Sequence, residues 1–183
     1  MIKRVSLNPV LKKLQQSGFY WGSITAVEAK SLLRDQAVGK FLVRDSSDPR
    51  HLFTITLVTS TGITNVRIIF CESLFSLDKE ESLTWQRNGA ESKEQSTPRF
   101  DCVVKMIFYY MLSSRMVLQK KEQLDNFATG SKFLLLSPLY KGVSSLQHLC
   151  RRTLNRQPFI RECQNALTPD PVKSYLSSYP YPI

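Results

Sequence analysis

A short apolar strand that ends in an arginine constrains the fold of this chain more than any other stretch. Phe41, Leu42 and Val43 form an unbroken apolar run, as expected of a central strand that is covered on both faces. Arg44 follows directly, so its guanidinium starts from a partly buried position and needs an anion. The next residues, Asp45-Ser46-Ser47-Asp48-Pro49, are typical of a turn.

Two interpretations of Arg44 are open at this point. Its planar guanidinium can donate two parallel hydrogen bonds to a phosphate, with Ser46 and Ser47 supplying hydroxyl groups beside it. Alternatively, Arg44 is an ordinary arginine at a strand end that forms an ion pair with Asp45 or Asp48. The stretch alone does not distinguish a phosphate site from an ion pair.

The residues after this strand predict an antiparallel meander. Residues 52–58 alternate apolar and polar side chains, a Ser-Thr-Gly turn follows, and residues 63–70 form a further apolar run. Residues 74–77 predict a brief fourth strand. Because side chains alternate along a strand, Val66 and Arg67 lie on opposite faces, and Arg67 is a candidate to help Arg44 bind a phosphate.

Helices are predicted on both sides of these strands. Asn8 can cap a first helix that ends at Gly18, and Thr25 with Glu28 has the pattern of a capping box for a second. The spacing of apolar residues from Phe100 to Met111 predicts an amphipathic third helix. We interpret 78–97 as a mobile loop, 115–130 as loop-like and 132–136 as a short strand or buried connector.

Two further helices are predicted near the C-terminus. The first has a possible capping box, Ser144 with Gln147, and an apolar face made of Leu146, Leu149, Cys150 and Leu154. A helix of about ten residues is marginal alone, so it must dock onto this chain or onto a partner. The second begins at Asp170-Pro171.

Composition excludes several function classes. The net charge of +10 comes from scattered lysines and arginines, which does not favour a dedicated nucleic-acid groove. Four cysteines without a CxxC pair and only two histidines give no zinc pattern, so we expect reduced thiols, no metal and no cofactor. The sequence contains no apolar run near the roughly 20 residues of a membrane span and no signal-peptide pattern, and we expect a cytoplasmic protein without membrane insertion.

Two segments resemble known families. Residues 19–25 and 41–47 resemble the Src-homology-2 (SH2) domain, which binds phosphotyrosine, and residues 145–154 resemble the elongin-binding box of the suppressors of cytokine signalling. The resemblance implies an α+β fold: a central antiparallel sheet flanked by two helices, followed by a small α-helical SOCS box. It implies an N-terminal helical extension at 1–17, an SH2 domain at 18–140 and a SOCS box at 144–183.

The resemblance also implies roles for individual residues. Phosphotyrosine would be bound by Arg44, Ser46, Ser47 and Arg67, and Val66 would line the groove that selects the peptide. Elongin B/C would be bound through Leu146, Leu149, Cys150 and Leu154. A cullin-type ligase scaffold is a weaker expectation, through Pro169, Pro171 and Val172.

Three departures from the family pattern limit what is carried over. Ala26 stands where many SH2 domains have an arginine. Only residues 1–7 precede the first helix, in the place of a kinase inhibitory segment, so we do not expect direct inhibition of a Janus kinase. Residues 168–171 supply the prolines of a cullin box, but Leu167 lies one position early, which weakens the expected recruitment of a cullin.

The expected function is therefore a non-catalytic adaptor. It would bind activated cytokine receptors or associated signalling proteins and recruit an elongin and cullin ubiquitin ligase, giving negative feedback on JAK-STAT signalling. One alternative is a phosphotyrosine-site competitor without ligase recruitment. Another is a cysteine phosphatase, because Cys150 and Arg156 have C-x5-R spacing.

Overall fold

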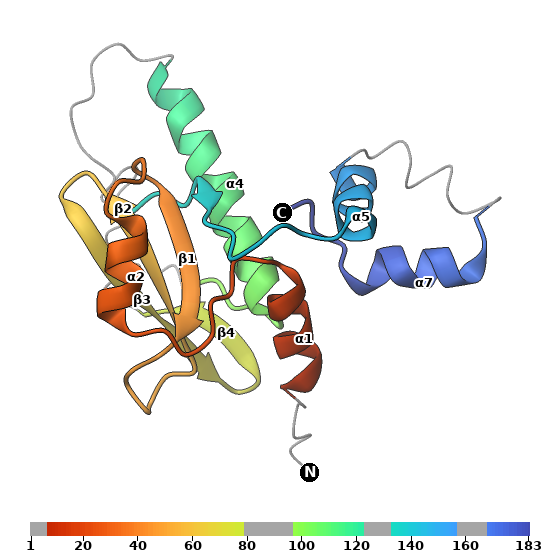
Figure 1. Cartoon of the computed structure of the whole chain (residues 1–183), viewed down its shortest axis with the longest axis horizontal. Helices are drawn as coiled ribbons and strands as arrows, with labels where there is room; N and C mark the ends of the chain where they lie inside the picture. Colours follow the sequence, from red (N-terminus) through yellow and green to blue (C-terminus); the bar gives the residue numbers. More distant parts are fainter. Residues whose placement is uncertain (1–6, 79–96, 123–132, 157–167) are drawn as a thin grey trace.

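The computed structural model describes residues 7–78, 97–122, 133–156 and 168–183. It forms a central sheet with helices on both faces and two C-terminal helices at one end (Figure 1). The elements are α1 (Asn8–Gln16), α2 (Ala26–Leu33), β1 (Lys40–Asp45), β2 (Phe53–Thr59), β3 (Gly62–Cys71), β4 (Leu74–Leu77), α4 (Val103–Glu122), β5 (Ser137–Pro138), α5 (Leu146–Arg156) and α7 (Asp170–Ser178).

The sheet has five strands in the order β4-β3-β2-β1-β5. Neighbouring strands from β1 to β4 are antiparallel, and the two-residue β5 pairs with β1 in parallel. The register aligns Arg44 with Thr54, and Thr54 with Arg67. Directly paired residues share a face of the sheet, so Arg44 and Arg67 lie on the same face.

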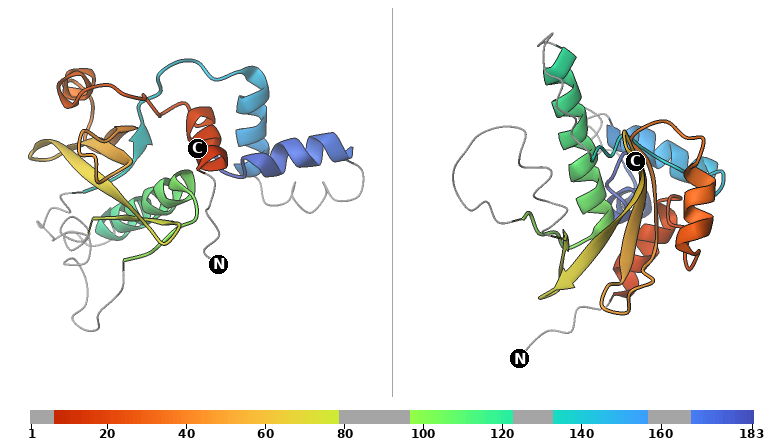
Figure 2. Two further views of the ribbon diagram at one scale, coloured as in Figure 1. Left: turned by 90° about the horizontal axis from the view of Figure 1, so that it is seen from below. Right: turned by 90° about the vertical axis from the view of Figure 1, so that its left-hand side faces the viewer.

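The two faces of the sheet are covered by different helices (Figure 2). On the face of Arg44, α2 packs against β1 and β2 through a small cluster that contains Leu33, Leu42 and Val58. On the other face, α1 and α4 cover the main core, which includes Phe41 and Ile55. The predicted α+β class, with an antiparallel sheet between helices and a helical C-terminal region, is confirmed.

The predicted capping box of α2 is present, whereas the capping residues of α1, α5 and α7 differ from the predictions. The capping box of Thr25 and Glu28 is formed. The N-cap of α1 is Leu7 rather than Asn8, and the N-cap of α7 is Pro169 rather than Asp170. In α5, the hydroxyl of Ser145, one residue after the predicted Ser144, accepts a hydrogen bond from the His148 amide at 3.2 Å.

Helix α4 is longer than predicted. It continues through residues 115–122, which we interpreted as loop-like because they are polar. Once the buried first half has fixed the helix axis, good helix formers such as lysine and glutamine can extend it into solvent. Of the two interpretations of 132–136, the described residues fit the buried connector, since Phe133 and Leu135 are buried, and the short strand β5 follows at Ser137–Pro138. Residues 79–96 of the predicted loop 78–97, and residues 123–130 of the predicted loop-like segment 115–130, lie outside the described residues.

The C-terminal helices dock onto the sheet domain through α1 and the last residues. His148 and Arg151 are the buried residues of α5. Tyr179 is fully buried, its ring lies 5.0 Å from that of His148, and Tyr181 contacts Phe108 of α4. None of the described helices is long and apolar enough to cross a membrane.

Burial of His148 makes the docking of α5 sensitive to pH. Desolvation, followed by the charges of Arg151 and Arg152, lowers the pKa of His148 from 6.5 to about 4. Between these values the unfolded chain binds a proton that the folded chain does not, so stability falls as the pH drops through this window. We expect His148→Gln to remove part of the loss of stability between about pH 7 and about pH 5, as measured by urea unfolding. Equal losses in both proteins would contradict this.

Candidate phosphate-binding site

Arg44 is buried at the end of β1 and is surrounded by neutral hydrogen-bond acceptors. Only 3% of the Arg44 surface is exposed to solvent. Nε donates to Thr56 Oγ1 at 3.2 Å, and Nη2 donates to Asn65 Oδ1 at 3.3 Å. Nη1 donates to the Asp45 carbonyl oxygen at 2.9 Å and to Ser47 Oγ at 3.3 Å. Strand β1, the turn after it and strands β2 and β3 together fix the direction of the guanidinium.

The alternative in which Arg44 forms an ion pair with a nearby aspartate is not observed. The carboxylate of Asp45 accepts a hydrogen bond from the Tyr20 hydroxyl, and that of Asp48 forms ion pairs with Arg50, His51 and Arg67. Among the described residues, no carboxylate lies within ion-pair distance of Arg44. Burial without a counter-charge lowers the pKa of Arg44, and an anion arriving there would remove this penalty.

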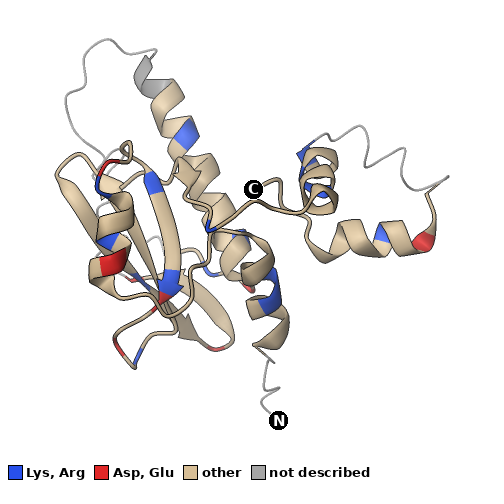
Figure 3. Cartoon of the chain, viewed as in Figure 1, with Lys and Arg blue, Asp and Glu red and all other residues tan. Residues whose placement is uncertain are grey.

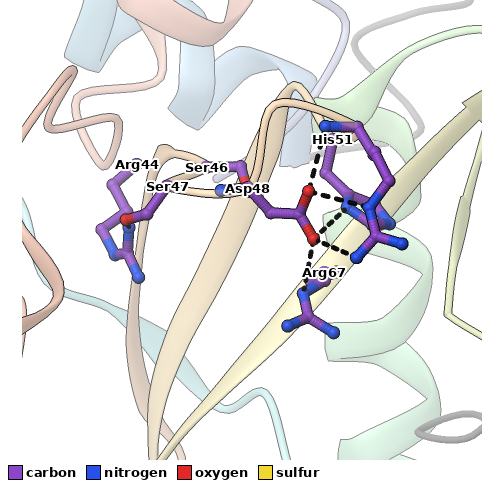
Figure 4. A network of polar contacts seen from close by, with 7 residues as sticks. Arg44, Ser46, Ser47, Asp48, His51 and Arg67 are labelled. Carbon is purple, nitrogen blue, oxygen red and sulfur yellow. Dashed lines mark hydrogen bonds and ion pairs between the residues drawn. The ribbon is translucent and has the colours of Figure 1, made fainter.

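Asp48 organises the turn beside Arg44. Its carboxylate lies 2.8 Å from Arg50 Nη2, 3.5 Å from His51 Nδ1 and 3.8 Å from Arg67 Nε. In Figure 4 these contacts lie on the side of Asp48 that faces away from Arg44. The hydrogen bonds from Arg50 hold the pKa of Asp48 well below its usual range. Asp48 therefore remains ionised while leaving the Arg44 guanidinium without a carboxylate.

The structure brings some of the predicted phosphate-binding residues together. Ser47 contacts Arg44 directly, whereas Ser46 Oγ accepts a hydrogen bond from the Asp48 amide at 3.1 Å and shapes the turn. Arg67 shares the sheet face of Arg44, but its half-exposed side chain is turned toward Asp48. Arg44 and the turn thus form a compact site, with Arg67 beside it.

Sequence reasoning missed two residues that hold Arg44. Thr56 Oγ1 donates to Asn65 Oδ1 at 2.8 Å, and both oxygens accept hydrogen bonds from Arg44. The sequence does contain a signal for Thr56, because Thr54 and Thr56 alternate with apolar residues along β2. Both threonines are therefore expected on the face of the sheet opposite the main core, which is the face of Arg44. Without the strand register, the sequence could not show which of the two threonines is in reach.

Val66, predicted to line the peptide groove, is buried in the core. Val66 is 2% exposed and belongs to the main core with Phe53 and Ile68. It lies on the face of β3 that packs toward α4, as the alternation along the strand requires. Its position in this structure contributes to packing of the core.

The predicted elongin-binding face of α5 points outward. The exposed fraction is 76% for Leu146 and 40% for Leu149, Cys150 is exposed, and Leu154 is half-buried. The polar residues His148 and Arg151 are buried instead. In the segment predicted to bind a cullin, Pro169, Pro171 and Val172 are all exposed.

The helical conformation of α5 counts against the cysteine phosphatase alternative. Cys150 and Arg156 lie in one uninterrupted helix. A phosphatase loop needs several backbone amides that point at one phosphate, and in a helix these amides are directed along the axis to carbonyl groups.

Lysine and arginine positions of the described residues are spread along the chain, over the helices and strands (Figure 3). The described part of the C-terminal region, 133–156 and 168–183, contains a single acidic residue, Asp170.

Comparisons with known proteins identify relatives over most of the chain. The model of the SH2 domain family matches residues 19–110. The chain is 38% identical to suppressor of cytokine signaling 3 from Gallus gallus, covering 94% of this chain and 82% of that protein. It is 36% identical to suppressor of cytokine signaling 3 from Homo sapiens (94% and 84% covered) and 36% identical to human suppressor of cytokine signaling 2 (97% and 82% covered).

Proposed function

The chain belongs to the suppressor of cytokine signalling family and contains an SH2 domain, and on this basis we propose that it is a non-catalytic adaptor that binds tyrosine-phosphorylated proteins and dampens cytokine signalling. The observation that carries the proposal is Arg44, a guanidinium that is 3% exposed and held only by neutral groups. Its natural complement is a dianion such as a phosphate ester.

The arrangement around Arg44 supports a phosphate at the end of a long side chain. The guanidinium is buried against side chains of β2 and β3, and it also contacts Ser47 in the turn that carries Ser46 and Ser47. A phosphate there would accept charge-assisted hydrogen bonds from Arg44, with the turn hydroxyls as further donors. A phosphotyrosine extends its phosphate further from the backbone than a phosphoserine does, and so can reach a buried cation.

The same proposal gives the chain three parts. In it, residues 18–140 would be the SH2 domain and residues 144–183 the SOCS box, preceded by an N-terminal extension at 1–17 whose described part contains α1. The outward-facing Leu146, Leu149 and Cys150 support binding of elongin B/C through α5, because exposed apolar side chains on one helix face are suited to a groove on a partner. Through elongin B/C the adaptor would recruit a ubiquitin ligase in the cytoplasm.

A second candidate function keeps phosphotyrosine binding without ligase recruitment, so that the protein competes with other readers for the same receptor sites. The observation in its favour is the segment that leads into the first turn of α7. Thr168-Pro169-Asp170-Pro171 lacks a leucine in the register of a cullin box. The two candidates differ in elongin capture and in ubiquitin transfer to a bound phosphoprotein.

Peptide binding by the full chain tests the proposal. A tyrosine-phosphorylated peptide array selects a sequence, and calorimetry then compares that peptide with its phosphoserine and unphosphorylated forms. We expect saturable binding of the phosphotyrosine form only. Each charged hydrogen bond to the phosphate contributes about 1.5–3 kcal/mol, so the phosphotyrosine peptide should bind at least about tenfold more tightly than the other two forms. Equal binding of the phosphoserine peptide would overturn the proposed phosphotyrosine specificity.

A further inference from the structure

A second buried arginine shares the features that mark Arg44. Arg151 of α5 is 2% exposed, and among the described residues no carboxylate lies within ion-pair distance of it. Nη1 donates to the Tyr175 carbonyl oxygen at 3.2 Å and to Ser178 Oγ at 3.0 Å. Nη2 donates to His148 Nδ1 at 2.7 Å and, more weakly, to Gln16 Oε1 at 3.5 Å.

A cleft lies beside Arg151, where the sheet domain meets the C-terminal helices. It has a volume of about 510 Å³ and is lined by α1, the 141–145 segment, α5 and α7. Its lining includes the cations Lys141 and Arg151 together with Gln15, Ser144 and Ser145, and it contains no aspartate or glutamate. We call this space the junction cleft.

Two residues that line the junction cleft, His148 and Arg151, each carry a buried donor without a hydrogen-bond partner among the described residues. Arginine can only donate, so His148 Nδ1 accepts from Arg151, and the neutral ring carries its proton on Nε2. Both His148 Nε2 and Arg151 Nε are buried without a partner among the described residues. Buried donors without partners are uncommon and call for an explanation.

The surroundings do not neutralise this positive region. The only acidic side chain in the described C-terminal residues is Asp170, at the far end of α7 from the cleft (Figures 1 and 3). Arg151 lies over the rings of Tyr175 and Tyr179, at 4.3 and 5.0 Å from their centres. Such contacts compensate part of the desolvation of a cation, but they supply no counter-charge.

We propose that the junction cleft is an anion-binding site for a phosphate-class oxyanion, with Arg151 and Lys141 as its cations and the hydroxyls of Ser144 and Ser145 as further donors. The anion would contact the 141–145 segment and α5 at once. It would therefore strengthen the docking of the C-terminal helices onto the sheet domain. The shared chemistry is a phosphate dianion, supplied either free or as a phosphate ester.

The two histidines of the chain provide separate reporters for an experiment. His148 lies in the junction cleft, and His51 lies at the turn beside Arg44. Histidine ring signals of the full chain are followed by NMR while inorganic phosphate, or in a second series phenyl phosphate, replaces chloride at constant ionic strength. We expect a saturable shift of the His148 signals that persists in the Arg44→Lys variant. If only phenyl phosphate gives a saturable shift, the site binds phosphate esters. If both compounds give a saturable shift, the site also binds free inorganic phosphate.

Matched variants test which cations form the site. Lys141→Gln is expected to weaken the response of His148 about fivefold, because an exposed lysine contributes modestly. Lys12→Gln, which changes an exposed lysine outside the cleft, should leave it unchanged. Arg151→Gln should abolish it, and if that variant does not fold, Lys141→Gln still decides. A His148 response that never saturates, or that is equal in Lys141→Gln and Lys12→Gln, would overturn the proposal.

Discussion

Replacing Arg44 with lysine is expected to abolish measurable binding of a phosphotyrosine peptide to the full chain. Lysine keeps the positive charge but loses the planar fork that can donate two parallel hydrogen bonds to one phosphate. It also cannot reproduce the set of neutral contacts through which Thr56 and Asn65 orient the guanidinium. At about 1.5–3 kcal/mol for each charged hydrogen bond, the loss of two corresponds to at least about a hundredfold weaker binding in calorimetry.

A matched control is available on the same turn. Arg50 has a 79% exposed side chain and is paired with Asp48, so Arg50→Lys changes the same chemical group outside the buried site. We expect its affinity to stay within about threefold of the original, since exposed ion pairs contribute little. If Arg44→Lys binds the peptide as tightly as Arg50→Lys does, with both proteins folded by circular dichroism, Arg44 is not the phosphate ligand.

The elements that carry Arg44 could be predicted because local pattern and burial agree there. The run Phe41–Val43, the alternation along β2 and the capping box of Thr25 and Glu28 each indicate one structure, and each forms. The partners of Arg44 could not be predicted. Which of two threonines or two aspartates reaches a guanidinium depends on strand register and on the path of a turn, and neither is a local property.

The docking of α5 differs from the simplest interpretation of its sequence. An amphipathic helix is expected to bury its apolar side, yet α5 buries His148 and Arg151 and leaves Leu146 exposed. The reason is that the surface it meets is aromatic and polar, formed by Tyr175, Tyr179 and carbonyl oxygens, where a guanidinium can both stack and donate. Residues distant in sequence create that surface, so helical periodicity alone could not reveal it.

The outward apolar face of α5 leads to the second large effect. We expect the double substitution Leu146→Pro with Cys150→Phe to abolish capture of purified elongin B/C by the tagged full chain. Leu146 is the first residue of α5, a position that tolerates proline because its amide has no partner within the helix. The variant therefore loses a leucine from the proposed contact and gains an obstructing ring at Cys150 while the helix remains. A leucine side chain that becomes buried in such a complex contributes about 1.5–3 kcal/mol to binding.

The control for this substitution lies on the opposite part of the molecule. Val27 of α2 is 77% exposed, compared with 76% for Leu146, so Val27→Ser removes an equally exposed apolar side chain outside the proposed interface. Capture of elongin B/C should then be unchanged, while both variants keep the phosphotyrosine binding that depends on Arg44. Equal capture by the double variant and by Val27→Ser would move the elongin interface away from α5. Failure of the original chain to capture elongin B/C would favour the competitor function, in which the SH2 domain acts alone.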